Sequence, residues 1–285
     1  MLAYRLKALL SSGILGALLG NMACMPVRGD AKEEAADTPP FLVNASKSTG
    51  LSSALNKMLS EGIGFIGEKN WDLAIAKFDA VLKRAPRAAS AFANRGVCYL
   101  YIGDEDKGIA DLTKAVKLDP DLREPTESSL GYALLSRGKA RVDRGDATGA
   151  RRDFAAATAI PLVRARALSE LSYIELNQGS MQACLNRATE ALEADPKLVE
   201  ALMNRAVCLA AFNRHHEALL DLNRALELDG SNAGALISRA GVYKSLNQCK
   251  EAVADARAAV HLDPSLTEAA KATLEPCAKP KENHK

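Results

Sequence analysis

Cysteine is the residue type with the widest chemical scope in this chain of 285 residues. The six cysteines are Cys24, Cys98, Cys184, Cys208, Cys249 and Cys277. No Cys-x-x-Cys pair occurs, so the spacing predicts neither a zinc ribbon nor a thioredoxin-like redox site. The adjacent His215 and His216 are expected in a turn as solvated side chains, because a metal site needs several converging ligands. The cysteines are therefore candidates for disulfide bonds or for small buried side chains.

The remainder of the sequence offers no catalytic grouping. We find no nucleophile beside a matched base, no carboxylate pair in an apolar setting and no glycine-rich loop suited to phosphate. The formal net charge is +2, without a run of Lys or Arg, which argues against a nucleic-acid surface. The sequence thus predicts a protein that is not an enzyme and that holds neither a metal nor a cofactor.

The N-terminal segment, residues 1–24, has the pattern of an export signal. A basic start with Arg5 and Lys7 precedes an apolar stretch of about 12 residues, too short to span a bilayer comfortably. Residues 25–50 contain Pro, Ala, Ser and acidic residues without apolar periodicity, which predicts a flexible linker. We therefore expect an exported protein of the bacterial periplasm or cell envelope.

The end of this segment determines how the chain would meet a membrane. It resembles a bacterial lipoprotein signal, in which small residues precede a cysteine that receives the lipid, here Cys24. Ala23 fits that pattern, whereas Asn21 departs from it. Lipidation of Cys24 and ordinary cleavage after Ala23 are therefore alternatives. We expect membrane attachment only through a lipid on Cys24.

Proline recurs at a regular spacing through the rest of the chain. Pro86 and Pro120 are 34 residues apart, and Pro196 and Pro264 are 68 apart, which is twice that period. When each proline is set at position 32 of a 34-residue unit, six units begin at Leu55, Ala89, Gly131, Ala165, Val199 and Ala233. Small residues recur at positions 8, 20 and 27, and position 24 is often bulky. This pattern is typical of two antiparallel helices that approach closely.

On these positions, residues 51–266 resemble the tetratricopeptide repeat family. The resemblance implies an all-α solenoid of about six tandem helix pairs, each stabilised by its neighbours. Residues Arg123 to Leu130 exceed the period and would lengthen the following helix. Residues 267–285 would form a capping helix, from Thr267 to Glu275, and a tail.

A correlation between positions 7 and 23 tests this alignment. Both positions lie equally far from the turn at position 15, so antiparallel helices would bring them side by side. The predicted ion pairs are Arg95–Asp111, Arg137–Asp153, Arg205–Asp221, Arg239–Asp255 and, with the signs exchanged, Glu61–Lys77. In the fourth unit Leu171 stands opposite Arg187, and we expect no pair there.

The alignment also narrows the cysteine pairings. Cys184 and Cys208 fall on adjacent antiparallel helices, and Cys249 and Cys277 would meet if the capping helix folds back. For each of these pairs, a disulfide and two structural thiols are alternatives. Cys98 has no partner in this scheme and is expected to pack in the core as a small buried side chain.

The resemblance further implies that the first helix of each unit lines a concave groove that receives a ligand. At position 6, Asn94 and Asn204 carry amides that could hold an extended peptide backbone. The other expected contact residues are Tyr101, Lys139, Arg166, Tyr173 and Lys244. Leu59 and Ile63 occupy positions where chaperone-binding members of the family carry Lys and Asn, so we do not expect chaperone binding.

Two functions follow as alternatives. In the first, the protein is a non-enzymatic interaction scaffold at the cell envelope that binds a peptide segment or a protein partner in the groove. In the second, it is a structural accessory subunit of an envelope assembly that uses its convex face or its edges.

Overall fold

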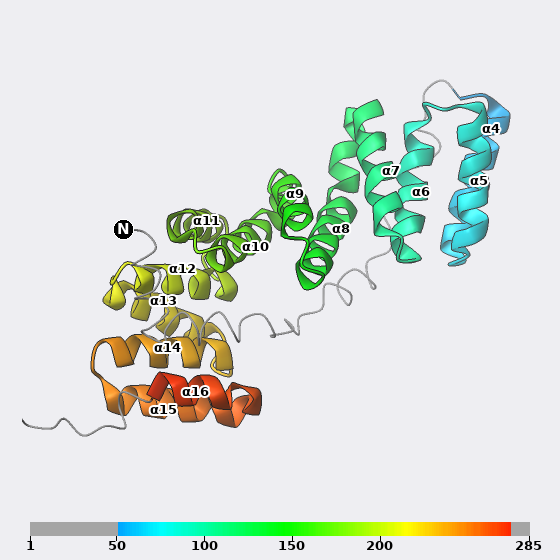
Figure 1. Ribbon diagram of the computed structural model, residues 1–285. Coiled ribbons are helices and arrows are strands. Elements are labelled where there is room, and N and C mark those ends of the chain that lie inside the picture. Colours follow the sequence, from blue (N-terminus) through cyan, green and yellow to red (C-terminus); the bar gives the residue numbers. More distant parts are fainter. Residues whose placement is uncertain (1–50, 275–285) are drawn as a thin grey trace, which may run out of the picture. The chain divides into compact units, whose positions relative to one another are not determined.

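The protein is entirely α-helical over the residues that the structure describes. The computed structural model describes residues 51–274, which form thirteen α-helices and contain no strand (Figure 1). This confirms the all-α fold expected from the sequence. The chain divides into two compact units that part between Arg164 and Ala165. We call residues 51–164 the N-terminal unit and residues 165–274 the C-terminal unit.

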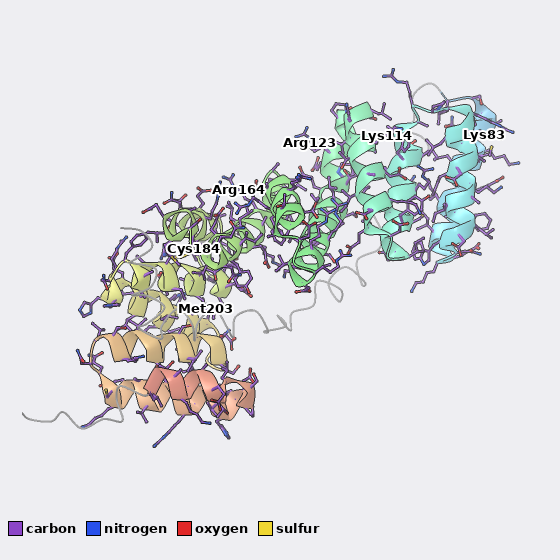
Figure 2. The ribbon with its side chains drawn as sticks, viewed as in Figure 1. Lys83, Lys114, Arg123, Arg164, Cys184 and Met203 are labelled. Atoms are coloured by element: carbon purple, nitrogen blue, oxygen red, sulfur yellow. A yellow bond between two sulfur atoms is a disulfide. The ribbon has the colours of Figure 1, made fainter. Side chains whose placement is uncertain are left out.

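The N-terminal unit is a stack of three helical hairpins in which each helix packs against the next. The helices are α4 (Ser53–Gly67), α5 (Trp71–Arg84), α6 (Ala89–Tyr101), α7 (Glu105–Leu118), α8 (Arg123–Asp143) and α9 (Ala147–Ala157). Short 3-10 turns, η2 (Pro120–Leu122) and η3 (Pro161–Val163), follow α7 and α9. Helix α8 begins at Arg123, which is labelled in Figure 2, so the expected extension of this helix is confirmed.

The C-terminal unit contains the remaining helices. They are α10 (Arg164–Asn177, whose first residue precedes the boundary), α11 (Met181–Ala194), α12 (Val199–Ala211), α13 (His215–Leu228), α14 (Ala233–Ser245), α15 (Cys249–Leu262) and, after the 3-10 turn η4 (Pro264–Leu266), α16 (Thr267–Leu274). Helix α16 packs on both α14 and α15, which confirms a capping helix at the position expected. From α11 to α15 each helix packs on the next in sequence order.

Each hairpin turns at position 15 of its unit through one residue with a positive φ. These residues are Lys69, Gly103, Gly145, Gly179, Asn213 and Asn247, with φ between 56° and 83°. Glycine adopts this left-handed conformation without steric cost, and asparagine tolerates it better than other residues. In five of the six units the turn residue therefore favours ending the first helix at the same position of the repeat, and in the first unit Lys69 takes the same conformation.

The small residue at position 8 lets the two helices of a hairpin approach. In the first unit Gly62 lies against Phe78 at position 24, and a Cβ at Gly62 would lie only 2.6 Å from Phe78 Cε1. Phe78 and Phe154, which occupies the same position in the third unit, are both fully buried. A glycine at position 8 thus makes the space that the phenylalanine ring at position 24 fills.

All five ion pairs predicted between positions 7 and 23 are present. Each joins a first helix to the second helix of its own hairpin, with its shortest N···O distance at 2.6 or 2.7 Å. The four arginines use Nε and Nη2 together, one for each oxygen of the aspartate. In the fourth unit Arg187 instead pairs with Glu190 on its own helix. The agreement confirms the register of the hairpins.

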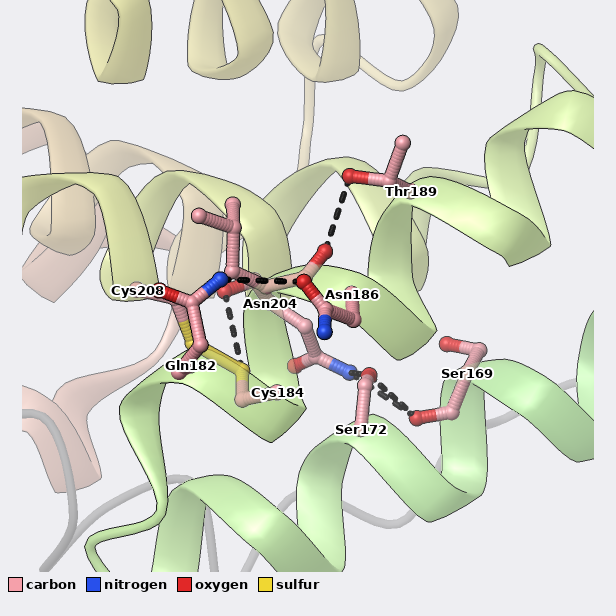
Figure 3. Close-up of a disulfide and its surroundings, with 9 residues drawn as sticks. Ser169, Ser172, Gln182, Cys184, Asn186, Thr189, Asn204 and Cys208 are labelled. Atoms are coloured by element: carbon pink, nitrogen blue, oxygen red, sulfur yellow. Dashed lines mark hydrogen bonds between the residues drawn. A yellow bond between two sulfur atoms is a disulfide. The ribbon is translucent and has the colours of Figure 1, made fainter.

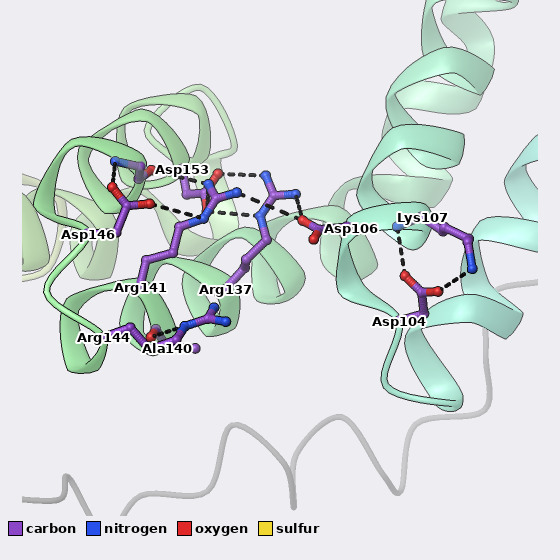
Figure 4. A network of polar contacts seen from close by, with 10 residues as sticks. Asp104, Asp106, Lys107, Arg137, Ala140, Arg141, Arg144, Asp146 and Asp153 are labelled. Atoms are coloured by element: carbon purple, nitrogen blue, oxygen red, sulfur yellow. Dashed lines mark hydrogen bonds and ion pairs between the residues drawn. The ribbon is translucent and has the colours of Figure 1, made fainter.

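The pair of the third unit is part of a larger network, shown in Figure 4. Asp153 accepts hydrogen bonds from Arg137 Nη2 at 2.6 Å and from Arg141 Nη1 at 2.7 Å, and its side chain is only 4% exposed. Arg137 Nη1 also reaches Asp106 on α7 at 2.8 Å. The same guanidinium therefore joins its own hairpin to the preceding one.

Candidate functional site

The two asparagines expected to bind a ligand lie inside the helix stack. Asn94 is fully buried and Asn204 is 4% exposed. Asn204 Nδ2 donates to the carbonyl oxygen of Ser169 at 3.1 Å and to Ser172 Oγ at 2.8 Å, both on α10 (Figure 3). The burial of both side chains corrects the expectation that the amides face a ligand, and the Asn204 amide instead satisfies buried polar groups on the first helix of the preceding repeat.

The other five expected contact residues are accessible to different degrees. Arg166 is exposed, and Lys139, Tyr173 and Lys244 are half-buried. The Tyr101 side chain is 37% exposed, and its ring stacks on Trp71 with a centroid distance of 4.3 Å. Tyr101 and Lys139 belong to the N-terminal unit, whereas Arg166, Tyr173 and Lys244 belong to the C-terminal unit.

Arg166 and Tyr173 share one face of α10. They are seven residues apart, which is about two helical turns or roughly 10 Å along the helix. Glu170 and Asn177 complete this stripe at helical spacing, while Ala167, Leu168, Leu171 and Ile174 elsewhere on α10 are buried. The structure thus brings a guanidinium and a phenol together on the accessible side of a first helix.

The four described cysteines have three environments. Cys184 on α11 and Cys208 on α12 form a disulfide, so the pair placed on adjacent helices by the alignment is bonded (Figure 3). Cys249 is also disulfide-bonded, while Cys277 and the lipidation candidate Cys24 lie outside the described residues. Cys98 is a free, fully buried thiol, and burial raises its pKa to about 12. Cys98 therefore packs as a small apolar side chain, as expected.

The adjacent histidines begin α13 rather than standing in the turn before it. His215 is half-buried, and its Nδ1 atom has no hydrogen-bond partner among the described residues. Burial, together with the nearby His216, lowers the pKa of His215. Over residues 51–274 no cluster of three or more His, Cys, Asp or Glu side chains is arranged to hold a metal ion.

A cavity that the sequence did not reveal lies among α11, α12 and α13 of the C-terminal unit. It has a volume of about 600 Å³ and is lined by residues of α11, α12 and α13, including Leu185, Thr189, Arg205, Leu209 and Leu220. Leu220 is 69% exposed. Repeat alignment could have pointed to this region, because Thr189 stands where the first and fifth units carry the acceptors Asp79 and Asn223.

None of the helices in the described part of the chain combines the length and the apolar character needed to cross a bilayer.

Stacked helical hairpins with a common turn position define an α-helical repeat protein, a class whose repeats present binding surfaces on their outer faces. The tetratricopeptide repeat family model matches residues 59–122 and 185–233 of this chain. Tetratricopeptide repeats are protein-interaction scaffolds, and catalysis is not their general role.

Curated relatives match parts of this chain. An FK506-binding protein-like protein of Rattus norvegicus is 40% identical over 82 residues, which is 29% of this chain and 23% of that protein. Hsp70-Hsp90 organizing protein 3 of Arabidopsis thaliana is 33% identical over 60 residues, 21% of this chain and 11% of that protein. The chain spans about a tenth to a quarter of the length of the curated relatives that it matches.

Two solved structures share the fold over most of their own length. The PilF protein of Pseudomonas aeruginosa aligns with a TM-score of 0.50 and 16% identity over 78% of this chain and 97% of that one. YrrB, a tetratricopeptide-repeat protein with an unusual peptide-binding site, aligns with a TM-score of 0.50 and 19% identity over 68% of this chain and 95% of that one. At these identities the likeness is one of fold.

Proposed function

We propose that the protein is a non-enzymatic scaffold of the cell envelope that binds a peptide segment of a partner protein along the first helices of its C-terminal unit. The observation that carries the proposal is the placement of Arg166 and Tyr173 on one accessible face of α10. Export rests on the pattern of residues 1–24, which lie outside the described residues.

The chemistry of this face suits an acidic peptide segment. The Arg166 guanidinium can donate two parallel hydrogen bonds to a carboxylate, and the Tyr173 ring can pack against an apolar side chain. Their separation of roughly 10 Å is close to one turn of a polyproline II chain, which takes three residues at about 3.1 Å each and returns side chains to the same side. A segment with an acidic residue and an apolar residue three positions apart therefore fits both side chains.

Binding should be tested with an array of twelve-residue peptides that vary this spacing, followed by fluorescence polarisation on the best binders. Arg166→Ala combined with Tyr173→Ala should weaken those binders at least tenfold. Arg224→Ala is the matched control, because Arg224 is an exposed arginine on the second helix α13 that pairs with Glu227. If the double variant binds as tightly as the unaltered protein, the proposed first-helix site is wrong.

The envelope location has its own test. Palmitate labelling of the unaltered protein and of Cys24→Ser, combined with cell fractionation, distinguishes a lipid anchor from simple secretion. Equal labelling of both proteins would contradict lipidation of Cys24, and retention of the chain in the cytoplasm would contradict the export proposal.

The alternative function, a structural subunit that docks through its convex face, is favoured by one observation. The cavity is lined by residues of the second helices α11 and α13 together with Arg205 and Leu209 of α12, and its lining includes neither Arg166 nor Tyr173.

A further inference from the structure

Three of the four arginines at position 7 make a further contact that ties adjacent repeats together. Arg95 Nη1 donates to Asp79 Oδ1 at 2.5 Å, and Arg137 Nη1 donates to Asp106 Oδ1 at 2.8 Å. In the C-terminal unit, Arg239 Nη1 donates to Asn223 Oδ1 at 2.9 Å. Each acceptor lies on the second helix of the preceding repeat. The position-7 Nη1 atom therefore normally binds a side-chain oxygen from a neighbouring helix.

Arg205 is the fourth of these arginines, and it lacks this acceptor. Thr189 holds the repeat position that Asp79 and Asn223 hold in their units. Its hydroxyl donates to the carbonyl oxygen of Leu185 on its own helix at 2.8 Å (Figure 3). Arg205 uses Nε and Nη2 for Asp221, and Nη1 has no hydrogen-bond acceptor among residues 51–274.

The Arg205 side chain is correspondingly more accessible than its equivalents. It is 29% exposed, compared with 16% to 21% for the other three arginines. It also lines the cavity among α11, α12 and α13, whose apolar wall includes Leu185, Leu209 and Leu220. A cationic donor with unused hydrogen-bonding capacity thus stands beside the exposed Leu220 and the half-buried Leu185.

The other charged groups of the cavity wall are already paired. Glu190 accepts from Arg187 at 3.0 Å, and Glu217 accepts two hydrogen bonds from Arg214 at 2.6 and 2.7 Å. Arg205 itself is neutralised by Asp221, which raises the pKa of its guanidinium. Since every carboxylate of the wall has a cationic partner, an incoming acidic group would meet no unpaired negative charge there.

We propose that this cavity docks a partner protein through an aspartate side chain whose carboxylate accepts a hydrogen bond from Arg205 Nη1. The other repeats supply the argument, because two of their three acceptors are aspartates, and one of them, Asp79, stands at the repeat position of Thr189. An apolar residue next to that aspartate would cover Leu185 and Leu220. A free anion should bind more weakly than such a peptide. Asp221 already compensates the charge of Arg205, and a small anion lacks the apolar side chain whose burial supplies the remaining attraction.

The substitution Thr189→Asp provides the test, because it places a carboxylate where Asp79 stands relative to Arg95. The probe is the capped tripeptide acetyl-Leu-Asp-Leu-amide, and the readout is the NMR signal of the Arg205 Nε–H group in the full chain. We expect a saturable shift with a millimolar dissociation constant, and at least fivefold weaker binding of acetyl-Leu-Ala-Leu-amide. Thr189→Asp should weaken binding of the aspartate peptide at least tenfold and should not lower the melting temperature.

Matched controls separate this site from other effects of charge. Gln248→Asp adds the same charge at the exposed N-cap of α15, outside the cavity, and should leave binding of the peptide unchanged. Leu220→Ser, at an exposed position, should weaken it about threefold without unfolding the protein. Arg166→Ala with Tyr173→Ala should have no effect, so the outcome is independent of the proposed first-helix site.

Three results would overturn the proposal. One is equal binding of the aspartate and alanine peptides, and another is unchanged affinity in Thr189→Asp. The third is an equal shift produced by sodium acetate at the same concentration, which would reduce the site to a general anion contact.

Discussion

Arg239 on α14 and Asp255 on α15 are sixteen residues apart in sequence and are joined by two hydrogen bonds, of 2.7 and 2.9 Å. Both side chains are largely withdrawn from solvent, at 21% and 11% exposed. The paired geometry of a guanidinium and a carboxylate is directional, so it fixes the rotation of one helix against the other as well as their separation.

Breaking this pair from one side should cost more than removing both partners. Asp255→Ala should lower the free energy of unfolding by about 2 kcal/mol, because it leaves a partly buried guanidinium without its carboxylate. Arg239→Leu with Asp255→Ala should recover part of that loss, since Leu171 fills position 7 of the fourth unit. Urea denaturation of the full mutant cycle measures the coupling energy. A coupling near zero would mean that the pair contributes nothing to stability.

Asn204 and Ser238 occupy position 6 in successive units and should respond in opposite ways to alanine. Asn204→Ala removes two buried hydrogen bonds and should cost about 2 kcal/mol. Ser238 Oγ is buried without a partner among the described residues, so Ser238→Ala should be neutral or slightly stabilising. Equal losses in the two variants, measured by urea denaturation, would contradict the structural role given to Asn204.

Gly62 and Gly64 lie on the same helix and form a second matched pair. Gly64→Ala should stabilise the protein by about 0.5 to 1 kcal/mol, because nothing lies within 4 Å of the added methyl group and alanine favours helix. Gly62→Ala should destabilise it by about 1 to 3 kcal/mol, because the methyl group would meet the buried Phe78 ring. The melting temperatures should therefore move in opposite directions. A rise in both would show that the hairpin can open to admit the methyl group.

The disulfide between Cys184 and Cys208 should stabilise the C-terminal unit by restricting its unfolded chain. The two residues are 24 apart, and closing a loop of that length is worth about 3 kcal/mol. Cys184→Ala with Cys208→Ala should lower the urea midpoint accordingly under oxidising conditions. Because Cys249 is also disulfide-bonded, adding reductant to the double variant serves as the control for that second bridge. Equal urea midpoints of the oxidised proteins would mean that the bridge does not contribute to stability.

The interior of the hairpins could be predicted in detail from the sequence. Every pair between positions 7 and 23 could be named in advance, including its loss at Leu171 and Arg187. That was possible because a helical hairpin with a turn at a known position has only one register, so spacing along the chain becomes contact in space. The placement of Cys184 and Cys208 on adjacent helices could be predicted from the same register.

The outcome for Asn94 and Asn204 could not be predicted in this way. Within a hairpin, spacing determines contact, but position 6 meets the preceding hairpin, and the closeness of that packing depends on the side chains of both. The sequence suggested a ligand for these amides, whereas the structure shows them buried.

What the sequence alone determined is local and periodic: the helices, the turns at position 15 and the pairing within each hairpin, because these depend on residues a fixed distance apart in one chain segment. Only the tertiary structure shows which polar atoms find a hydrogen-bond partner where one hairpin packs on the next. Thr189 and Asp79 occupy the same repeat position, yet the Thr189 hydroxyl bonds to its own helix and leaves Arg205 Nη1 beside a cavity. The difference begins with the threonine hydroxyl, which can donate to a carbonyl of its own helix as an aspartate carboxylate cannot. That the freed Arg205 Nη1 lies beside a cavity depends on the packing of α11, α12 and α13, which the spacing of residues within one repeat does not contain.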